Sequence, residues 1–262
     1  MTNILVQTDG GRATVTLNRP EFLNALSPDM AHDLHHALLG LKRDKGVRCV
    51  VLEGAGRGFM AGGDIGFFQR ILPVLGAGET RELAPILRDV HGIIETLRTM
   101  PAPVIGALHG AVAGFGVSLA AACDLAVAVE SARFTLAYCH IGTSPDGGSS
   151  YILPRVIGFR KAMELALLGN RFDAREALAL GLVNRVVPDD AMEAALEEWT
   201  GHITEGPRLA YARTKALLYG SLDNSFEEQI ALEEASFKEC ARTTDFAEGV
   251  AAFMEKRKAK FG

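Results

Sequence analysis

The chain begins with two short segments in which apolar and polar residues alternate, residues 4–8 and 13–17. Alternation with a period of two is typical of strands that bury one face. The two segments are separated by Asp9, Gly10 and Gly11, a sequence that favours a tight turn. We therefore expect a β-hairpin near the N-terminus.

The apolar spacing then changes to that of a helix. Ser27 followed by Pro28 makes a good helix start, because serine can cap free N–H groups and proline suits the first turn. Apolar residues then recur every three or four positions, as a helix with one buried face requires. These residues are Met30, Leu34, Ala37, Leu38 and Leu41.

A unit of strand, glycine-rich loop and helix follows, and the chain repeats it. In the first unit, residues 47–52 enter the loop 54–63, and Asp64 can cap the helix after it. Repeated units of this kind are typical of α/β folds, and we predict that fold class. The second unit comprises strand 104–108, loop 110–116, helix 117–123 and a further strand 125–129.

Between the two units, residues 67–80 have weak periodicity and contain Pro73, Gly76 and Gly78. This composition favours a mobile loop. A helix with Pro85 near its start is predicted next. Its buried stripe would consist of Leu83, Leu87, Val90, Ile94 and Leu97.

Beyond Pro188 the pattern contains only helices. They are predicted over residues 191–199, 207–218, 226–241 and 245–260. We therefore divide the chain into an α/β core, residues 1–188, and a helical C-terminal region, residues 189–262.

Composition narrows the function classes. With 48% hydrophobic and 23% charged residues, the chain has the balance of a globular protein with a substantial core. A net charge of -5 argues against a nucleic-acid partner. No signal peptide or membrane span is expected, and the four cysteines lack the spacing of a zinc site or a disulfide framework. We expect a cytoplasmic protein with reduced thiols and no membrane partner.

The two glycine-rich loops are the first candidates for chemistry. Residues 56–64 leave a strand and open a helix, and residues 110–116 do the same. N–H groups at a helix N-terminus have no partner within the helix and carry a partial positive charge. Two such loops facing one another could hold an oxygen that becomes negative during a reaction, which would make an oxyanion hole.

Several stretches, taken in order, resemble the enoyl-CoA hydratase/isomerase family, the crotonase superfamily, and in motif most of all its epoxyphenylacetyl-CoA isomerase-like members. The resemblance implies a spiral of ββα turns, followed by a helical region that holds a homotrimer or homohexamer together. It also implies an acyl-CoA substrate, with coenzyme A as part of that substrate and no tightly bound cofactor or metal. The stretches are residues 17–20, 24–26, 59–64, 103–124, 134–169 and 248–257.

The same resemblance assigns roles to individual residues. It places the oxyanion hole at the N–H groups of Gly63 and Phe115, and the family often has glycine at the second position. Phe115 can donate its N–H if its φ is negative, and its side chain should reshape the acyl pocket. The basic run 256–258 could meet a CoA phosphate or be a solvated helix end. The remaining substrate contacts would be Leu23, Ala25, Ala61, Gly62, Asp64, Ile65, Gly114, Ser118 and Tyr138.

The acidic residues distinguish between reactions. The family's hydratases use two glutamates, whose positions fall here on Ser118 and Tyr138, and neither is an effective base at neutral pH. Asp146 stands where the hydratases have glycine, and some family isomerases carry a carboxylate there. One carboxylate suits a proton shuttle that removes a proton beside the thioester and returns it further along the chain. We predict an isomerase that rearranges either a double bond or a ring, with Asp146 as its base.

Three alternatives stay open. Asp146 could direct a water in a hydratase, or it could be a turn residue, because Pro-Asp-Gly is common in turns, in a chain that binds acyl-CoA without catalysis. His91 and Asp146 also fall where 4-chlorobenzoyl-CoA dehalogenases carry a base and a nucleophile, which would make His91 catalytic. Tyr138 replaces the tryptophan of those enzymes, and His91 lies at the edge of a buried helix stripe.

Two further motifs point to other enzyme classes. His32 and His36 are spaced like the ligands of a zinc metalloprotease, but a third ligand is missing and Asp33 stands in place of glutamate. Residues 116–120 approximate a serine-hydrolase elbow around Ser118, with alanine where the second glycine belongs. We interpret the histidines as a solvated helix face and do not expect a serine nucleophile.

Overall fold

Two β-sheets form the centre of the computed structural model, which describes residues 2–262. The larger sheet has six strands in the order β1-β2-β3-β5-β7-β10, and the smaller has four in the order β4-β6-β8-β9. The strands are β1 Ile4–Asp9, β2 Arg12–Leu17, β3 Cys49–Gly54, β4 Gly58–Met60, β5 Val104–Leu108, β6 Ala111–Ala113, β7 Leu125–Val129, β8 Arg133–Thr135, β9 Phe172–Asp173 and β10 Arg185–Val187.

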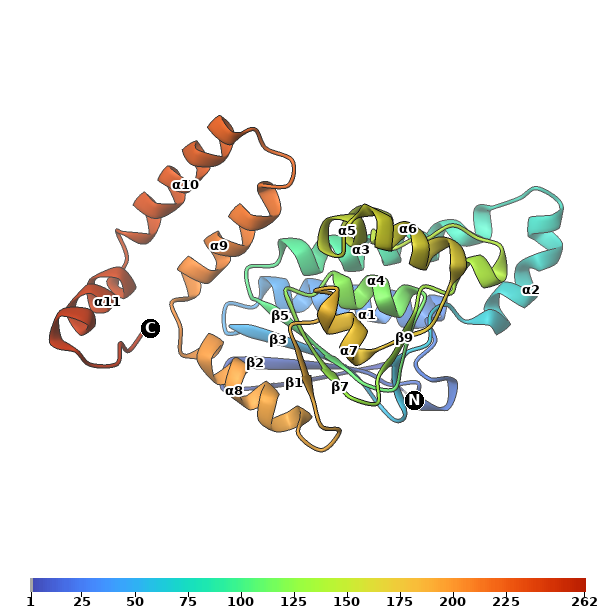
Figure 1. Ribbon diagram of the computed structural model, residues 1–262, viewed down its shortest axis with the longest axis horizontal. Helices are drawn as coiled ribbons and strands as arrows, with labels where there is room; N and C mark the ends of the chain where they lie inside the picture. Colours follow the sequence, from blue (N-terminus) through green and yellow to red (C-terminus); the bar gives the residue numbers. More distant parts are fainter. Residues whose placement is uncertain (1) are drawn as a thin grey trace.

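Helices cover the sheets and form the whole C-terminal part of the chain (Figure 1). The α-helices are α1 Pro28–Arg43, α2 Ile65–Gly76, α3 Ala84–Thr99, α4 Phe115–Ala121, α5 Ser149–Val156, α6 Phe159–Leu168, α7 Ala174–Ala179, α8 Met192–Thr204, α9 Arg208–Gly220, α10 Phe226–Cys240 and α11 Thr244–Glu255. Three short 3-10 helices are η1 Pro20–Phe22, η2 Arg81–Leu83 and η3 Tyr138–Ile141.

Consecutive turns of the chain give one strand to each sheet. β3, β5 and β7 are neighbours in the large sheet, whereas β4, β6 and β8, which follow them in sequence, are neighbours in the small one. All of these neighbours pair in parallel, and helical segments connect each pair of strands to the next. The arrangement is a spiral of ββα turns, so the predicted α/β fold class is confirmed.

The N-terminal elements form for the local reasons expected. Gly10 and Gly11 adopt positive φ angles of 55° and 85°, which glycine tolerates without steric cost, and β1 pairs antiparallel with β2. The Ser27 side chain accepts a hydrogen bond from the Met30 N–H at 3.2 Å and caps α1. The helix buries Met30, Ala31, Leu34, Leu38 and Leu41.

The prediction of a mobile loop over residues 67–80 is wrong for most of that segment. Residues 65–76 form α2, with Pro73 inside the helix. The Asp64 side chain accepts the Phe67 N–H at 3.1 Å and caps the helix, as predicted for this aspartate. Only Ile71 is buried, because α2 contributes to the wall of a cavity rather than to the core, and the usual helical periodicity of core contacts is therefore weak.

The C-terminal helices occur where the pattern placed them, with one shorter than predicted. α11 ends at Glu255 because Lys256 adopts a left-handed φ of 55°, so the helix does not reach residue 260. α8 packs against β3 and β7, whereas α9, α10 and α11 extend away from the sheets at the orange to red end of Figure 1. The division at residue 188 follows the last strand, which ends at Val187, and as a domain boundary it stays a prediction.

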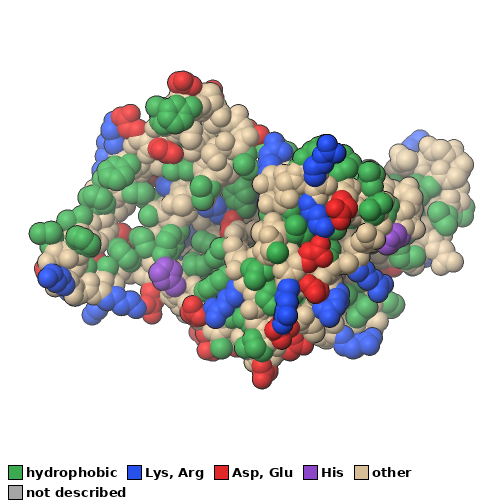
Figure 2. Space-filling model, viewed as in Figure 1, with side chains coloured by type: hydrophobic (Ala, Val, Ile, Leu, Met, Phe, Trp, Pro, Cys, Tyr) green, Lys and Arg blue, Asp and Glu red, His purple; other side chains and the backbone are tan. Residues whose placement is uncertain are grey.

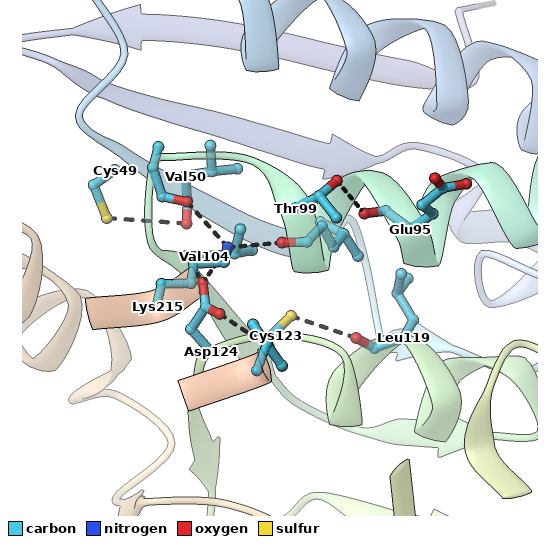
Figure 3. A network of polar contacts seen from close by, with 12 residues as sticks. Cys49, Val50, Glu95, Thr99, Val104, Leu119, Cys123, Asp124 and Lys215 are labelled. Carbon is cyan, nitrogen blue, oxygen red and sulfur yellow. Dashed lines mark hydrogen bonds and ion pairs between the residues drawn. The ribbon is translucent and has the colours of Figure 1, made fainter. Parts of the chain in front are cut away.

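A buried ion pair ties α9 to the core (Figure 3). The Lys215 ammonium lies 2.7 Å from Asp124 Oδ2 and donates to the Leu97 carbonyl at 2.7 Å. The Val104 N–H also donates to Asp124 Oδ2 at 2.7 Å, and the Tyr219 hydroxyl donates to Oδ1 at 3.0 Å. Burial raises the pKa of the Asp124 carboxyl against the pull of Lys215, and it lowers the pKa of Lys215.

Across residues 2–262, no helix is long and apolar enough to cross a membrane. The four cysteines, Cys49, Cys123, Cys139 and Cys240, are all free.

Candidate functional site

A cavity of about 410 Å³ lies between the two glycine-rich loops, α2, α3 and the segment that follows β8. Among residues 2–262, its wall contains only two titratable side chains, Tyr138 and Asp146, and no lysine, arginine, histidine or glutamate. The glycine loops contribute Ala61, Gly62, Gly63, Gly114 and Phe115. The cavity therefore brings one carboxylate together with the backbone of both loops.

The two glycine loops are in direct contact because their closest residues lack side chains. A Cβ on Gly62 would lie 3.2 Å from the Ala113 carbonyl oxygen, and one on Gly114 would lie 3.3 Å from Gly62 Cα. Both residues also have positive φ, 96° and 51°, a conformation that L side chains rarely adopt. Glycine at these two positions is what lets the loops meet.

Each loop contributes to the cavity wall one residue whose backbone N–H is free, Gly63 in the first loop and Phe115 in the second. Leu26 bonds to Gly62 through its N–H at 2.7 Å and to Asp64 through its carbonyl at 3.0 Å, which holds the loop on both sides of Gly63. Phe115 is the first residue of α4, where the helix offers its N–H no partner. In the described chain, residues 2–262, neither the Gly63 nor the Phe115 N–H has a hydrogen-bond partner.

Phe115 meets the condition set for it by the sequence, since it is absent from the residues with positive φ. Its side chain is 3% exposed and lies over Gly147, where a Cβ would be 2.6 Å from the ring. Gly147 itself has a φ of 58°. The phenylalanine ring and the glycine after Asp146 therefore pack as a matched pair, and the ring shapes the cavity beside the carboxylate.

Asp146 is held by hydrogen bonds at two points. The Tyr138 hydroxyl donates to its Oδ1 at 2.6 Å. Its main-chain carbonyl accepts from the Ser149 hydroxyl at 2.9 Å and from the Ser118 hydroxyl at 3.1 Å. Asp146 Oδ2 has no hydrogen-bond partner in residues 2–262. One carboxylate oxygen is thus fixed, and the other is free to act on a bound molecule.

Tyr138 is a donor to Asp146 and not a base. It is 8% exposed, and burial, with the nearby Asp146 charge as the next cause, raises the pKa of its phenol well above the ordinary range. The Ser118 hydroxyl lies 3.0 Å from the Tyr138 oxygen and is fully buried behind it. The two positions where hydratases of the resembled family would have glutamates thus hold hydroxyl groups bonded to Asp146.

Other substrate contacts predicted from the sequence divide into two groups. Ala61, Gly62, Ile65, Gly114 and Tyr138 line the cavity.

Leu23, Ala25, Asp64 and Ser118 are not part of its wall. The Leu23 carbonyl accepts the Ala61 N–H at 3.0 Å. Asp64 bonds to Arg19 at 3.0 Å, and Arg19 also donates to the Ala25 carbonyl at 2.5 Å. These residues support the first glycine loop from behind.

His91 is not brought to the cavity. It is exposed on α3, whereas its neighbours Val90 and Leu87 line the wall. The structure therefore does not place it beside Asp146, as a dehalogenase-like base would require.

The remaining motifs also lie apart from the cavity. His35 bonds to Asp89 at 2.9 Å and His32 lies 3.5 Å from it, yet residues 2–262 contain no group of three His, Cys, Asp or Glu side chains that could hold a metal ion. In the basic run, Arg257 pairs with Glu248 and Glu255, and Lys258 pairs with Glu205. Two of its three charges are therefore already engaged within the chain.

Apart from Ile65, the sequence did not predict the apolar wall that α2, η2 and α3 give the cavity. Leu83 and Leu87 were assigned to a core stripe, but Leu87 is 36% exposed because it faces the cavity. The weak periodicity of residues 67–80 was the available signal for α2, whereas the regular spacing in α3 gave none. The full apolar wall from these segments consists of Ile65, Phe68, Leu83, Ile86, Leu87 and Val90.

Comparisons with known proteins agree with this fold. The model of the enoyl-CoA hydratase/isomerase family matches residues 7–262. A probable enoyl-CoA hydratase from Rhodobacter capsulatus is 38% identical, over 96% of this chain and 94% of that protein. The 1,2-epoxyphenylacetyl-CoA isomerase of Escherichia coli is 35% identical, over 98% of this chain and 97% of that protein. The crystal structure of a putative enoyl-CoA hydratase from Streptomyces coelicolor A3(2) superposes with a TM-score of 0.92 at 38% identity, over 99% of this chain and 94% of that one.

Proposed function

The chain belongs to the enoyl-CoA hydratase/isomerase family, and from that premise we propose that it moves the double bond of an enoyl-CoA thioester with Asp146 as its one acid-base group. The observation that carries the proposal is the cavity wall, which combines a single carboxylate with two unpartnered N–H groups. The CoA moiety belongs to the substrate, and no other cofactor is needed for this chemistry.

The reaction follows from the positions of these groups. The Gly63 and Phe115 N–H groups hold the thioester oxygen. Asp146 Oδ2 takes a proton from C2, so the C2–H bond breaks and the charge spreads over the thioester oxygen and C4. The same oxygen returns the proton to C4. The double bond moves from C3–C4 to C2–C3, and no atom is gained or lost.

Hydration is the second candidate, because several relatives that are 30–38% identical are named hydratases. In that case Asp146 Oδ2 would direct a water to C3. The cavity wall offers no second acid to protonate C2 at the same time, and the hydratases of the family use two glutamates for this pair of tasks. The single carboxylate therefore supports isomerisation better than hydration.

A self-association of the C-terminal helices is part of the proposal. α10 has no buried residue. Phe226 of α10 is 74% exposed, and Phe253 of α11 is 83% exposed. Figure 2 shows hydrophobic side chains along the arm formed by α9, α10 and α11. Large exposed apolar surfaces of this kind mark protein interfaces, and a homotrimer or homohexamer built through the arm would cover them.

The Asp146→Asn variant tests the proposed chemistry. We expect conversion of a 3-enoyl-CoA to its conjugated 2-enoyl isomer to fall by roughly 10²- to 10⁴-fold, since the amide cannot take up the proton. The conjugated product is measured by its ultraviolet absorbance, and its mass should equal that of the substrate.

Asp223→Asn is the matched control, because Asp223 also accepts a tyrosine hydroxyl at 2.6 Å, from Tyr151, but lies on the surface. Its rate should stay at the wild-type level. Wild-type activity in Asp146→Asn would contradict the role of Asp146, and a wild-type product from a 2-enoyl-CoA that is heavier by one water would favour the hydratase.

A further inference from the structure

Tyr138 and Ser118 form a hydrogen-bonded chain behind the Asp146 carboxylate. We propose that these two hydroxyls are positioning residues, which hold the Asp146 carboxyl group in one orientation so that the proton taken from the substrate is returned to the same substrate molecule and not exchanged with water. The inference rests on the proposed isomerisation and concerns how faithfully the proton is carried.

The hydrogens of the chain can be accounted for individually. An ionised carboxylate only accepts hydrogen bonds, so the single Tyr138 hydrogen must be donated to Asp146 Oδ1, at 2.6 Å. Tyr138 then has no hydrogen left for Ser118. The 3.0 Å contact between the two hydroxyls therefore has Ser118 as its donor. The order of donation is Ser118 to Tyr138 to Asp146, with the Ser118 hydrogen shared with the Asp146 main-chain oxygen at 3.1 Å.

This arrangement survives the reaction. When Asp146 carries the proton on Oδ2, Oδ1 is a carbonyl oxygen and still accepts from Tyr138. The tyrosine bond is thus made in both protonation states, and it opposes rotation of the carboxyl group between proton uptake and return. Burial keeps the Tyr138 hydroxyl protonated, so the donor stays available.

The surroundings limit other routes for the proton. The cavity wall that faces Asp146 from α2, α3 and the glycine loops carries no charged or titratable side chain apart from Tyr138. Phe115 covers Gly147 on the adjacent side. With no second acid or base at hand, solvent is the only competing partner for the Asp146 proton, and a carboxyl group that could rotate would meet it more often.

The test is single-turnover isomerisation, in D₂O, of a 3-enoyl-CoA that carries only ordinary hydrogen. Deuterium in the product and in recovered substrate is measured by mass spectrometry. Wild-type product should keep most of its transferred hydrogen. In Tyr138→Phe the deuterium fraction should rise several-fold. Because the lost bond is made to a charged group, kcat should fall on the order of tenfold to a hundredfold, with KM changed much less.

Tyr151→Phe is the control, since Tyr151 donates to Asp223 at the same 2.6 Å distance but outside the cavity. It should match the wild type in both rate and deuterium content. Ser118→Ala provides a second variant of nearly unchanged shape, and its deuterium fraction should rise by less than that of Tyr138→Phe. Circular dichroism of each variant establishes whether it is folded. If Tyr138→Phe does not fold, the deuterium content measured with Ser118→Ala tests the proposal.

The outcomes separate the two proposals. If the wild type does not convert a 3-enoyl-CoA at all, the proposed isomerisation is wrong and the inference falls with it. If the wild type isomerises but its product is fully deuterated, or if the folded variants contain no more deuterium than the wild type, the isomerisation stands and the positioning role of Tyr138 and Ser118 is overturned.

Discussion

Two aspartates that follow α4 in the sequence, Asp124 and Asp146, each accept a hydrogen bond from a tyrosine hydroxyl, but their other surroundings differ. Asp124 has both carboxylate oxygens occupied, by Tyr219 on Oδ1 and by Val104 and Lys215 on Oδ2. Asp146 has only Oδ1 occupied, by Tyr138, and it borders a cavity without a cation. Both oxygens of the first carboxylate have partners, whereas one oxygen of the second has none in residues 2–262.

Under the proposed isomerisation, the same pair of residue types would serve structure at Asp124 and chemistry at Asp146. A buried charge is tolerated when a cation and hydrogen bonds replace its hydration, and at Asp124 these partners engage both carboxylate oxygens. A general base needs the opposite arrangement, with a fixed orientation but an open oxygen facing the substrate. Lys215 beside Asp124, and the lack of any such cation in the wall around Asp146, separate the two roles.

The largest effect is expected for Lys215→Met, which leaves Asp124 buried without its cation. Removing one partner of a buried ion pair costs about 3–5 kcal/mol, so the free energy of unfolding measured in urea should fall by that amount. Adding Asp124→Asn to this variant should restore part of the loss, because the uncompensated charge is then gone.

Lys161→Met serves as the control, since Lys161 pairs with Glu164 and Glu176 at the surface. Its unfolding should change little. If Lys215→Met were as stable as Lys161→Met, the ion pair would not be what holds α9 to the core. The structural role assigned to Asp124 would then be wrong.

A smaller effect is expected for Gly147→Ala, next to the open aspartate. The new Cβ would meet the Phe115 ring at 2.6 Å and would also require a φ of 58°. Gly10→Ala pays for a similar φ of 55° but has nothing within 4 Å. Unfolding measurements should therefore show Gly147→Ala to be less stable than Gly10→Ala by about 1–3 kcal/mol, the usual cost of overpacking.

The isomerisation rate distinguishes the two glycine variants further. Gly147→Ala should also lower the isomerisation rate, because the Phe115 ring and the carboxylate must shift together, whereas Gly10→Ala should not. Equal stability of the two variants would show that the ring moves aside freely and that it does not fix the Asp146 loop.

The smallest effect is a loss of stability at alkaline pH, and we expect it for Tyr138 and for Tyr219 alike. Burial raises the pKa of Tyr138 and of Tyr219 above the ordinary value. A folded-state pKa above the unfolded one contributes stability that is complete below about pH 10 and is lost as pH rises beyond it. The stability of the wild type should therefore decline above that pH, and the decline should be less steep in Tyr138→Phe and in Tyr219→Phe.

An absorbance titration of tyrosinate checks the same prediction directly. Of the four tyrosines, Tyr138 and Tyr219 should ionise last, together with unfolding. Each phenylalanine variant should remove one late step. Loss of an early step in Tyr138→Phe would show that this hydroxyl is not the protected donor that the contrast with Asp124 requires.

The sequence by itself determined the elements that depend on neighbours a few residues away. The turn at Gly10 and Gly11 and the cap at Ser27 follow from local conformational preferences, and the buried face of α1 follows from helical spacing. The glycine loops and Asp146 were also identified from the chain, because their order and spacing resemble those of a known family.

Only the tertiary structure decided which side chains meet. It made residues 65–76 a helix at the cavity wall, turned His91 outward and paired Asp124 with Lys215 from the far end of the chain. It also joined Tyr138 to Asp146 by a hydrogen bond. From the sequence, Tyr138 was expected only to contact the substrate. Periodicity records which face of an element is buried, but not what lies opposite, since that depends on strand order and helix packing. For this reason the sequence could predict a base at Asp146, and only the fold could show which of its oxygens is free.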